Sequence, residues 1–165
     1  MKGKDSSDLM IICLYVDDLV ITGSNENDIK QFKEKMISEF KMTNLGELAY
    51  FLGLEFIKTS KGMMLHQRKY IITDVLKRFK MQNCNTAPTP LEANIKQIND
   101  ADETSVDITL YRQIVGSSRY ICHSRPDISF AAGLASRFME YPKQSHRVAA
   151  KRILSYLKGT SEFGF

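Results

Sequence analysis

The sequence lacks the features that mark membrane-spanning, secreted and metal-clipped proteins. Its longest unbroken apolar run, from Leu9 to Val16, is far shorter than the roughly 20 residues that a membrane-spanning helix needs. The first eight residues are polar and include acids, so we expect no secretory signal sequence. There are only 3 cysteines and no CxxC pair, which favours free thiols and an intracellular location, with the compartment left open. Internal repeats, low-complexity segments, nucleophile motifs and glycine loops for phosphate are also missing.

What is present is an ordinary globular composition with an uneven charge. The chain has 165 residues, of which 43% are apolar and 25% charged, enough to bury a core without disulfides. Residues 1–110 carry 14 basic and 16 acidic side chains, whereas residues 111–165 carry 9 basic and 3 acidic ones. The resulting balance of +6 in the last third favours a polyanionic partner, although a solvated basic helix face would give the same count.

The amino-terminal third predicts a hairpin followed by a helix. Leu9–Val16 and Leu19–Thr22 are rich in strand formers and are separated only by Asp17 and Asp18. Because these runs do not alternate with polar residues, we expect both strands to be covered on both faces or to lie centrally in a sheet. Ser24 or Asn25 then caps a helix. Its apolar face consists of Ile29, Phe32, Met36, Ile37 and Phe40.

A second hairpin and a second helix follow, which makes the fold class α+β. Ala49–Lys58 and Met63–His66 are the expected strands, with a turn at Ser60–Gly62. The helix spans Tyr70–Phe79, with Ile71, Val75 and Phe79 on one side.

Periodicity then disappears over residues 83–109, where Pro88, Pro90 and many acids and amides occur. We interpret residues 83–109 as a linker between a domain at 1–82 and a helical domain at 110–165. The expected helices in the second domain are Leu110–Ser124, one beginning at Pro126 and ending near Met139, and Ser145–Lys158, with Gly159 at the position after the last helix.

The most informative motif is Tyr15-Val16-Asp17-Asp18, because it places two carboxylates at the tip of an apolar hairpin. Adjacent carboxylates repel each other, and a divalent cation relieves that repulsion. Mg²⁺ accepts one or two carboxylates and takes further ligands from water and phosphates. Two such ions can hold the attacking and leaving oxygens of a phosphoryl transfer. A solvated acidic turn is the alternative.

At this point the sequence resembles a known family. The YVDD motif is similar to the catalytic hairpin of reverse transcriptases, and several further segments, in order, narrow the resemblance to the polymerase of copia-type retrotransposons. These segments are LYVDDLVITGSN (14–25), FKMTNLGELAYFLGLEF (40–56), APTP (87–90), LYRQIVGSSRYICHSRPDISFA (110–131) and AAKRILSYLKGT (149–160).

The resemblance implies the second half of a polymerase palm followed by a three-helix thumb. Asp17 would be a catalytic metal ligand for Mg²⁺ or Mn²⁺, with Asp18 beside it, and Tyr15 and Val16 would line the hairpin near the primer end. The family's metal site needs one more carboxylate than this hairpin offers, so the metal is expected only if that carboxylate is supplied. The partners would be an RNA template and an RNA–DNA or DNA duplex, with a dNTP in the intact enzyme and no membrane.

Two further segments would contact nucleic acid. The turn around Leu52 and Gly53 resembles the primer grip, although a glycine at a strand bulge is the alternative. Arg112, Gly116 and Tyr120 are spaced by four and share one helix face, which in related polymerases follows the minor groove. Alternatively, Tyr120 belongs to the core and Arg112 is merely solvated. On the last helix, Arg147, Lys151 and Lys158 form a basic stripe, of which Arg147 and Lys151 are expected to bind nucleic acid.

The resemblance also implies that a part of the enzyme is missing. A two-metal site needs another carboxylate, which in the family lies upstream of YVDD, and only 14 residues precede Tyr15 here. We therefore expect a fragment of a polyprotein that is inactive alone. The alternatives are a non-catalytic nucleic-acid-binding remnant and a non-functional pseudogene product. Ser118 stands where the family has a large apolar residue, so we expect a hydroxyl and a void in the apolar stripe of its helix.

Overall fold

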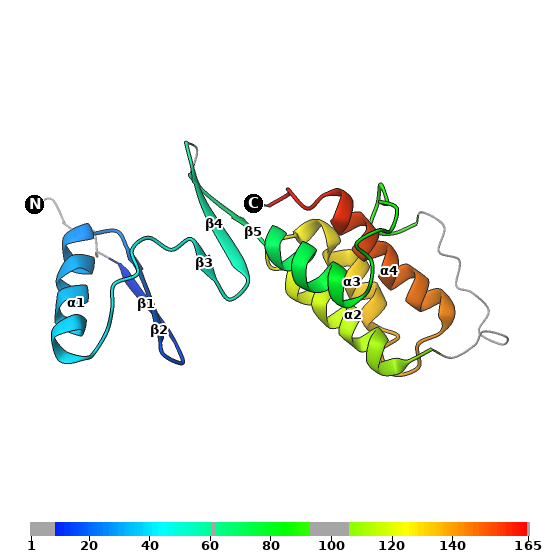
Figure 1. The fold of residues 1–165 in the computed structure, drawn as a ribbon, viewed down its shortest axis with the longest axis horizontal. Helices are drawn as coiled ribbons and strands as arrows, with labels where there is room; N and C mark the ends of the chain where they lie inside the picture. The colour runs from blue at the N-terminus through cyan, green and yellow to red at the C-terminus, as the bar shows by residue number, and fades with distance from the viewer. Residues whose placement is uncertain (1–8, 61, 93–105, 165) are drawn as a thin grey trace, which may run out of the picture. The chain divides into compact units, whose positions relative to one another are not determined.

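The computed structural model describes residues 9–60, 62–92 and 106–164, which form a mixed α+β chain as predicted (Figure 1). The expected linker at 83–109 lies partly outside the described residues, which omit 93–105. Within the described ranges no helix is long and apolar enough to cross a membrane. The chain divides into two compact units, Met1–Leu48 and Ala49–Phe165, and we describe each by itself.

The first unit consists of a two-stranded antiparallel ribbon and one helix. Strands β1 (Met10–Tyr15) and β2 (Asp18–Gly23) pair along their whole length, and helix α1 (Glu26–Glu39) packs against β2. The predicted cap is confirmed, because the Asn25 side chain accepts a hydrogen bond of 3.0 Å from the Asn27 amide.

The expectation that both strands are covered is wrong for the residues described. Strand β1 is exposed along its whole length, with Ile11 52% and Leu14 70% exposed, while Val20 in the middle of β2 is half-buried. The physical reason is that a two-stranded ribbon has two faces, and a single helix that packs on β2 covers only part of them. The apolar run therefore stays largely accessible to solvent.

The second unit begins with a three-stranded antiparallel sheet in the order β3-β4-β5. Its strands are β3 (Tyr50–Phe51), β4 (Leu54–Thr59) and β5 (Gly62–His66). The single strand expected at Ala49–Lys58 is thus two strands, because the chain reverses between Phe51 and Leu54, which pair with each other. The second reversal lies where it was predicted, since Thr59 pairs with Gly62.

Four helical segments build the core of this unit, and Figure 1 shows them lying alongside one another. They are the π-helical segment η1 (Tyr70–Leu76), α2 (Ile108–Ile121), α3 (Ser129–Ser136) with its leading 3₁₀ turn η3 (Pro126–Ile128), and α4 (Gln144–Gly159). The apolar face predicted for η1 and the residues that follow it is confirmed, because Ile71, Val75 and Phe79 are all buried.

Two buried polar groups of α2 are satisfied inside this core. Burial raises the pKa of Tyr111 to about 12, and its hydroxyl donates a hydrogen bond of 2.7 Å to the Ala135 carbonyl of α3. Ser118 is fully buried, and its hydroxyl donates to the Ile114 carbonyl of its own helix at 2.9 Å. The hydroxyl expected at Ser118 is therefore accommodated by the helix itself.

Helix ends differ from prediction in three helices. Helix α2 runs from Ile108 to Ile121 instead of from Leu110 to Ser124. The helix expected from Pro126 to Met139 starts with Pro126 in the first turn, as predicted, but ends at Ser136. Gly159 does not follow α4 but is its last residue, with Thr160 as the cap. A Cβ on Gly159 would lie 3.0 Å from the Cβ of Thr86, so a close approach of the chain explains this glycine.

Candidate active-site hairpin and nucleic-acid interface

The acidic hairpin turns one residue earlier than predicted. Tyr15 pairs with Asp18, so the two connecting residues are Val16 and Asp17, and Asp18 already belongs to β2. Val16 has a φ of 54° and is the first residue of the turn, a position that glycine occupies in the type II′ hairpin turns with this φ sign. Such a backbone costs a β-branched residue about 1–3 kcal/mol, which places strain directly beside the acids.

The two carboxylates are a partial fit to a divalent metal. Asp17 and Asp18 are both exposed, and in the part of the chain that the structure describes no Lys, Arg or His side chain pairs with either. They offer hard oxygen donors on adjacent residues, which suits Mg²⁺ or Mn²⁺. Among the described residues, however, no group of three His, Cys, Asp or Glu side chains gathers to hold a metal. Within the described ranges the hairpin therefore offers two candidate oxygen donors and no third.

The turn predicted as the primer grip is a tight reversal and not a bulge in a strand. Leu52 and Gly53 connect β3 to β4 and have φ values of 49° and 81°. Positive φ at both residues is the pattern of a type I′ hairpin turn, which favours Asn-Gly over Leu-Gly. Leu52 therefore holds an unfavourable conformation at an exposed turn, where its side chain is 44% exposed.

Tyr120 of α2 contacts this turn directly. Its hydroxyl donates a hydrogen bond to the Leu52 carbonyl, and a Cβ on Gly53 would lie 3.3 Å from the Tyr120 Oη. The Tyr120 ring packs edge-on against Tyr70, with 5.2 Å between the ring centroids, and against His123 at 5.9 Å. The structure thus joins Leu52, Gly53 and Tyr120, which the sequence placed in two separate nucleic-acid-binding segments.

The other two residues of the predicted helix face are exposed on α2. A Cβ on Gly116 would meet no described atom within 4 Å, so the helix surface is smooth there. The Arg112 Nε donates to the Met139 carbonyl at 2.9 Å, which fixes the direction of an exposed guanidinium group. Arg112 and Gly116 therefore form an accessible strip with one anchored positive charge.

The basic stripe predicted on α4 is only partly accessible to a nucleic-acid partner. Arg147 and Lys151 are half-buried on this helix, whereas the Lys158 Nζ donates to the Cys84 carbonyl at 2.6 Å. The Lys158 ammonium group is therefore engaged in holding the segment around Cys84. Arg152, which the sequence did not single out, pairs with Glu92 at 2.8 Å.

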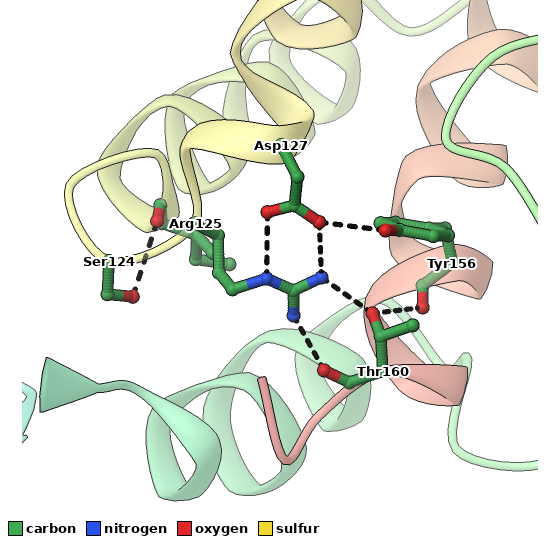
Figure 2. Close-up of polar contacts among 6 residues, drawn as sticks. Ser124, Arg125, Asp127, Tyr156 and Thr160 are labelled. Atoms are coloured by element: carbon green, nitrogen blue, oxygen red, sulfur yellow. Dashed lines mark hydrogen bonds and ion pairs between the residues drawn. The ribbon is translucent and has the colours of Figure 1, made fainter. Parts of the chain in front are cut away.

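The sequence did not predict the buried polar cluster around Arg125. Arg125 is 1% exposed and donates to both carboxylate oxygens of Asp127, to the Thr160 carbonyl and to the Thr160 hydroxyl (Figure 2). The Tyr156 hydroxyl donates to the same carboxylate at 2.8 Å. The cluster joins the start of α3 to the end of α4. The Arg-Pro-Asp spacing at 125–127 was its one sequence signal.

The comparison with a family model and the comparison with individual proteins agree with each other. Residues 1–93 match the family described as reverse transcriptase (RNA-dependent DNA polymerase). The chain is 37% identical over 163 residues to the retrovirus-related Pol polyprotein from transposon RE1 of Arabidopsis thaliana, and 37% identical over 170 residues to the Pol polyprotein from transposon TNT 1-94 of Nicotiana tabacum. These matches cover 99% and 97% of this chain but only 11% and 13% of the two polyproteins.

A shorter relative is also known. An uncharacterized mitochondrial protein of Arabidopsis thaliana is 34% identical over 153 residues, which cover 92% of this chain and 62% of that protein. No solved structure matches the chain significantly.

Proposed function

Because the chain belongs to the reverse transcriptase (RNA-dependent DNA polymerase) family, within the copia-type retrotransposon Pol polyproteins, we propose that it supplies one part of a two-metal polymerase site and of its nucleic-acid surface. The observation that carries this proposal is the pair of exposed carboxylates at the strained tip of an apolar hairpin. In this proposal residues 1–82 derive from the palm, 83–109 form the linker and 110–165 form the thumb.

Asp17 and Asp18 would hold the metal. When bound, Mg²⁺ or Mn²⁺ supplies the positive charge that stabilises the attacking and leaving oxygens of nucleotidyl transfer. The chain's own contribution is the placement of two oxygen donors at the tip of the hairpin, one in the strained turn and one at the start of β2. The third carboxylate that a two-metal site needs is proposed to come from another segment, so we expect the 165-residue chain alone not to incorporate nucleotides; among the described residues no third ligand gathers at the hairpin.

The nucleic-acid surface combines backbone and side-chain contacts. Leu52 is exposed and Gly53 half-buried, and this turn is proposed to contact the terminal nucleotide of the primer through its backbone. Separately, Tyr15 and Val16 of the hairpin are proposed to lie near the primer end. Gly116 permits α2 to approach the minor groove, and Arg112, Arg147 and Lys151 reach phosphates of an RNA–DNA or DNA duplex. The +6 balance of residues 111–165 supports this assignment.

A titration with paramagnetic Mn²⁺ tests the metal part of the proposal. Without the third carboxylate we expect the 165-residue chain to bind the ion only weakly, so the titration runs to high Mn²⁺ concentration. Relaxation enhancement of backbone amides should then be centred on residues 15–19 and should disappear in Asp17→Asn/Asp18→Asn. The matched control is Glu26→Gln/Asp28→Asn, which removes the exposed acids from the first turn of α1. Enhancement that follows the α1 acids, or that is unchanged in Asp17→Asn/Asp18→Asn, would contradict the proposal.

A non-catalytic nucleic-acid-binding module is the second candidate, and the basic excess of residues 111–165 favours it. It predicts hybrid binding that Mg²⁺ does not strengthen, because the cation competes for the phosphates, and that Asp17→Asn leaves unchanged. The polymerase proposal instead predicts that Mg²⁺ strengthens contact with the primer end only while both acids are present. Measuring the affinity for the hybrid with and without Mg²⁺, in the wild-type chain and in Asp17→Asn, separates the two candidate functions.

A further inference from the structure

The contact between Tyr120 and Leu52 joins two segments that lie 68 residues apart. Leu52 stands in the left-handed region of the backbone, at φ 49°, where leucine is rare and where neighbouring structure has to hold it. The Tyr120 hydroxyl is the group that does so, because it donates to the Leu52 carbonyl and lies against the neighbouring glycine.

The Tyr120 ring is itself held in place. Tyr70 at the start of η1 packs edge-on against one part of the ring and His123 against another. The next strand of the sheet is tied to the same region, because the Glu55 carboxylate accepts a hydrogen bond of 2.7 Å from the Lys69 amide. The Leu52–Gly53 turn is therefore attached to the helical core through the side chain of Tyr120, whose ring is held by its neighbours.

We propose that Tyr120 is a positioning residue, which sets the Leu52–Gly53 turn in the conformation that contacts the primer end, and that it does not itself stack on nucleic acid. The primer part of this inference rests on the proposed function. Since its hydroxyl is directed at the turn, Tyr120 acts through the backbone of Leu52. The accessible strip on α2 that is proposed to contact a duplex then consists of Arg112 and Gly116.

Two variants of α2 form a matched pair for the test. Tyr120→Phe removes the hydroxyl that holds the turn and keeps the ring. Tyr111→Phe removes a hydroxyl from the same helix that also donates to a backbone carbonyl, that of Ala135 in α3. Both changes delete one hydrogen bond to a carbonyl, but only one of these carbonyls belongs to the turn.

The first measurement uses no nucleic acid. Amide hydrogen exchange of residues 50–54 in the full chain should become about fivefold faster in Tyr120→Phe, the factor that loss of one ordinary hydrogen bond gives. It should stay at the wild-type rate in Tyr111→Phe. Unchanged exchange in Tyr120→Phe, or equal acceleration in both variants, would overturn the proposal whatever happens with nucleic acid.

The second measurement places 2-aminopurine either at the 3′ end of the primer or at its distal end, in an RNA–DNA hybrid. Tyr120→Phe should lose most of the fluorescence change at the 3′ end and keep hybrid affinity within about twofold, whereas Tyr111→Phe should keep both signals. A role in stability alone would lower the Tm and leave the 3′-end signal intact, which would overturn the primer part. If the wild-type chain gives no 3′-end signal, the proposed function fails for this turn, and the exchange result still decides whether Tyr120 positions it.

Discussion

Arg125 holds Asp127 through two parallel hydrogen bonds, from Nε at 2.9 Å and from Nη2 at 2.7 Å (Figure 2). The same guanidinium group donates to the Thr160 carbonyl at 2.7 Å, so one buried side chain connects the start of α3 to the end of α4. A buried cation that loses its anion is costly, and this relationship is therefore expected to contribute strongly to the stability of the second unit.

Asp127→Asn keeps the shape of the side chain but leaves the buried Arg125 charge without its anion. We expect it to lower the free energy of unfolding by about 2 kcal/mol, less than a fully buried pair would give because Asp127 is 37% exposed. Urea denaturation of the full chain measures this. Glu162→Gln is the control, since its pair with Arg68 is exposed on both sides and should contribute under about 0.5 kcal/mol. Equal losses in the two variants would refute the role given to Arg125.

The same carboxyl gives the chain a dependence on acid pH. Burial raises the pKa of Asp127, but hydrogen bonds from Arg125 and Tyr156 and the charge of Arg125 lower it more, so this pKa lies below its ordinary value. The unfolded chain then binds more protons than the folded chain as pH falls through the acid range. The stabilisation from Asp127 is complete above the ordinary value of about 3.9 and is lost as pH falls through the lower, folded pKa. Asp127→Asn should flatten the loss of stability below about pH 4; parallel acid-unfolding curves would argue against it.

Gly53 is predicted to be coupled energetically to Tyr120. Gly53→Ala meets two obstacles, a φ of 81° and an Oη at 3.3 Å from the new Cβ. We expect a loss of about 1–2 kcal/mol in stability. In the Tyr120→Phe background the steric obstacle is gone, so the same substitution should cost measurably less. A double-mutant cycle by urea denaturation gives the coupling, and strictly additive costs would show that the contact is unimportant in solution.

Binding of an RNA–DNA hybrid should weaken steeply with salt. Each lysine or arginine that neutralises a phosphate contributes about one unit to the slope of log affinity against log salt. Arg112→Ala and Lys151→Ala are each expected to reduce this slope by roughly one. Lys30→Ala, on the exposed surface of α1, should leave it unchanged. Equal slopes in the wild type and in all three variants would show that Arg112 and Lys151 do not contact phosphates of the hybrid.

The features that the sequence could predict are local. The acidic hairpin, the Asn25 cap and the apolar side of η1 follow from short-range patterns, and all three are present. The position of the first turn was wrong by one residue, because no propensity rule places a valine such as Val16 at positive φ.

The remaining features depend on long-range contacts. Nothing near Leu52 in the sequence indicates that a hydroxyl 68 residues away holds its carbonyl. Arg125 resembles an ordinary surface residue until the end of α4 is placed beside it. The cover expected for β1 was inferred from the lack of alternation in the apolar run, and that pattern does not say which segment provides the cover.

A cooperative thermal transition of the second unit would argue against the alternative that the chain is a pseudogene product without a stable fold.

We propose that Asp17 and Asp18 are part of a polymerase metal site and that this chain alone leaves the site incomplete. Primer extension on an RNA template with the purified 165-residue chain, in Mg²⁺ and in Mn²⁺, tests it most directly. We predict no nucleotide incorporation in either metal. Clear incorporation by the chain alone, abolished by Asp17→Asn, would show that this chain holds a complete metal site and would refute the proposal that it supplies only a part of one.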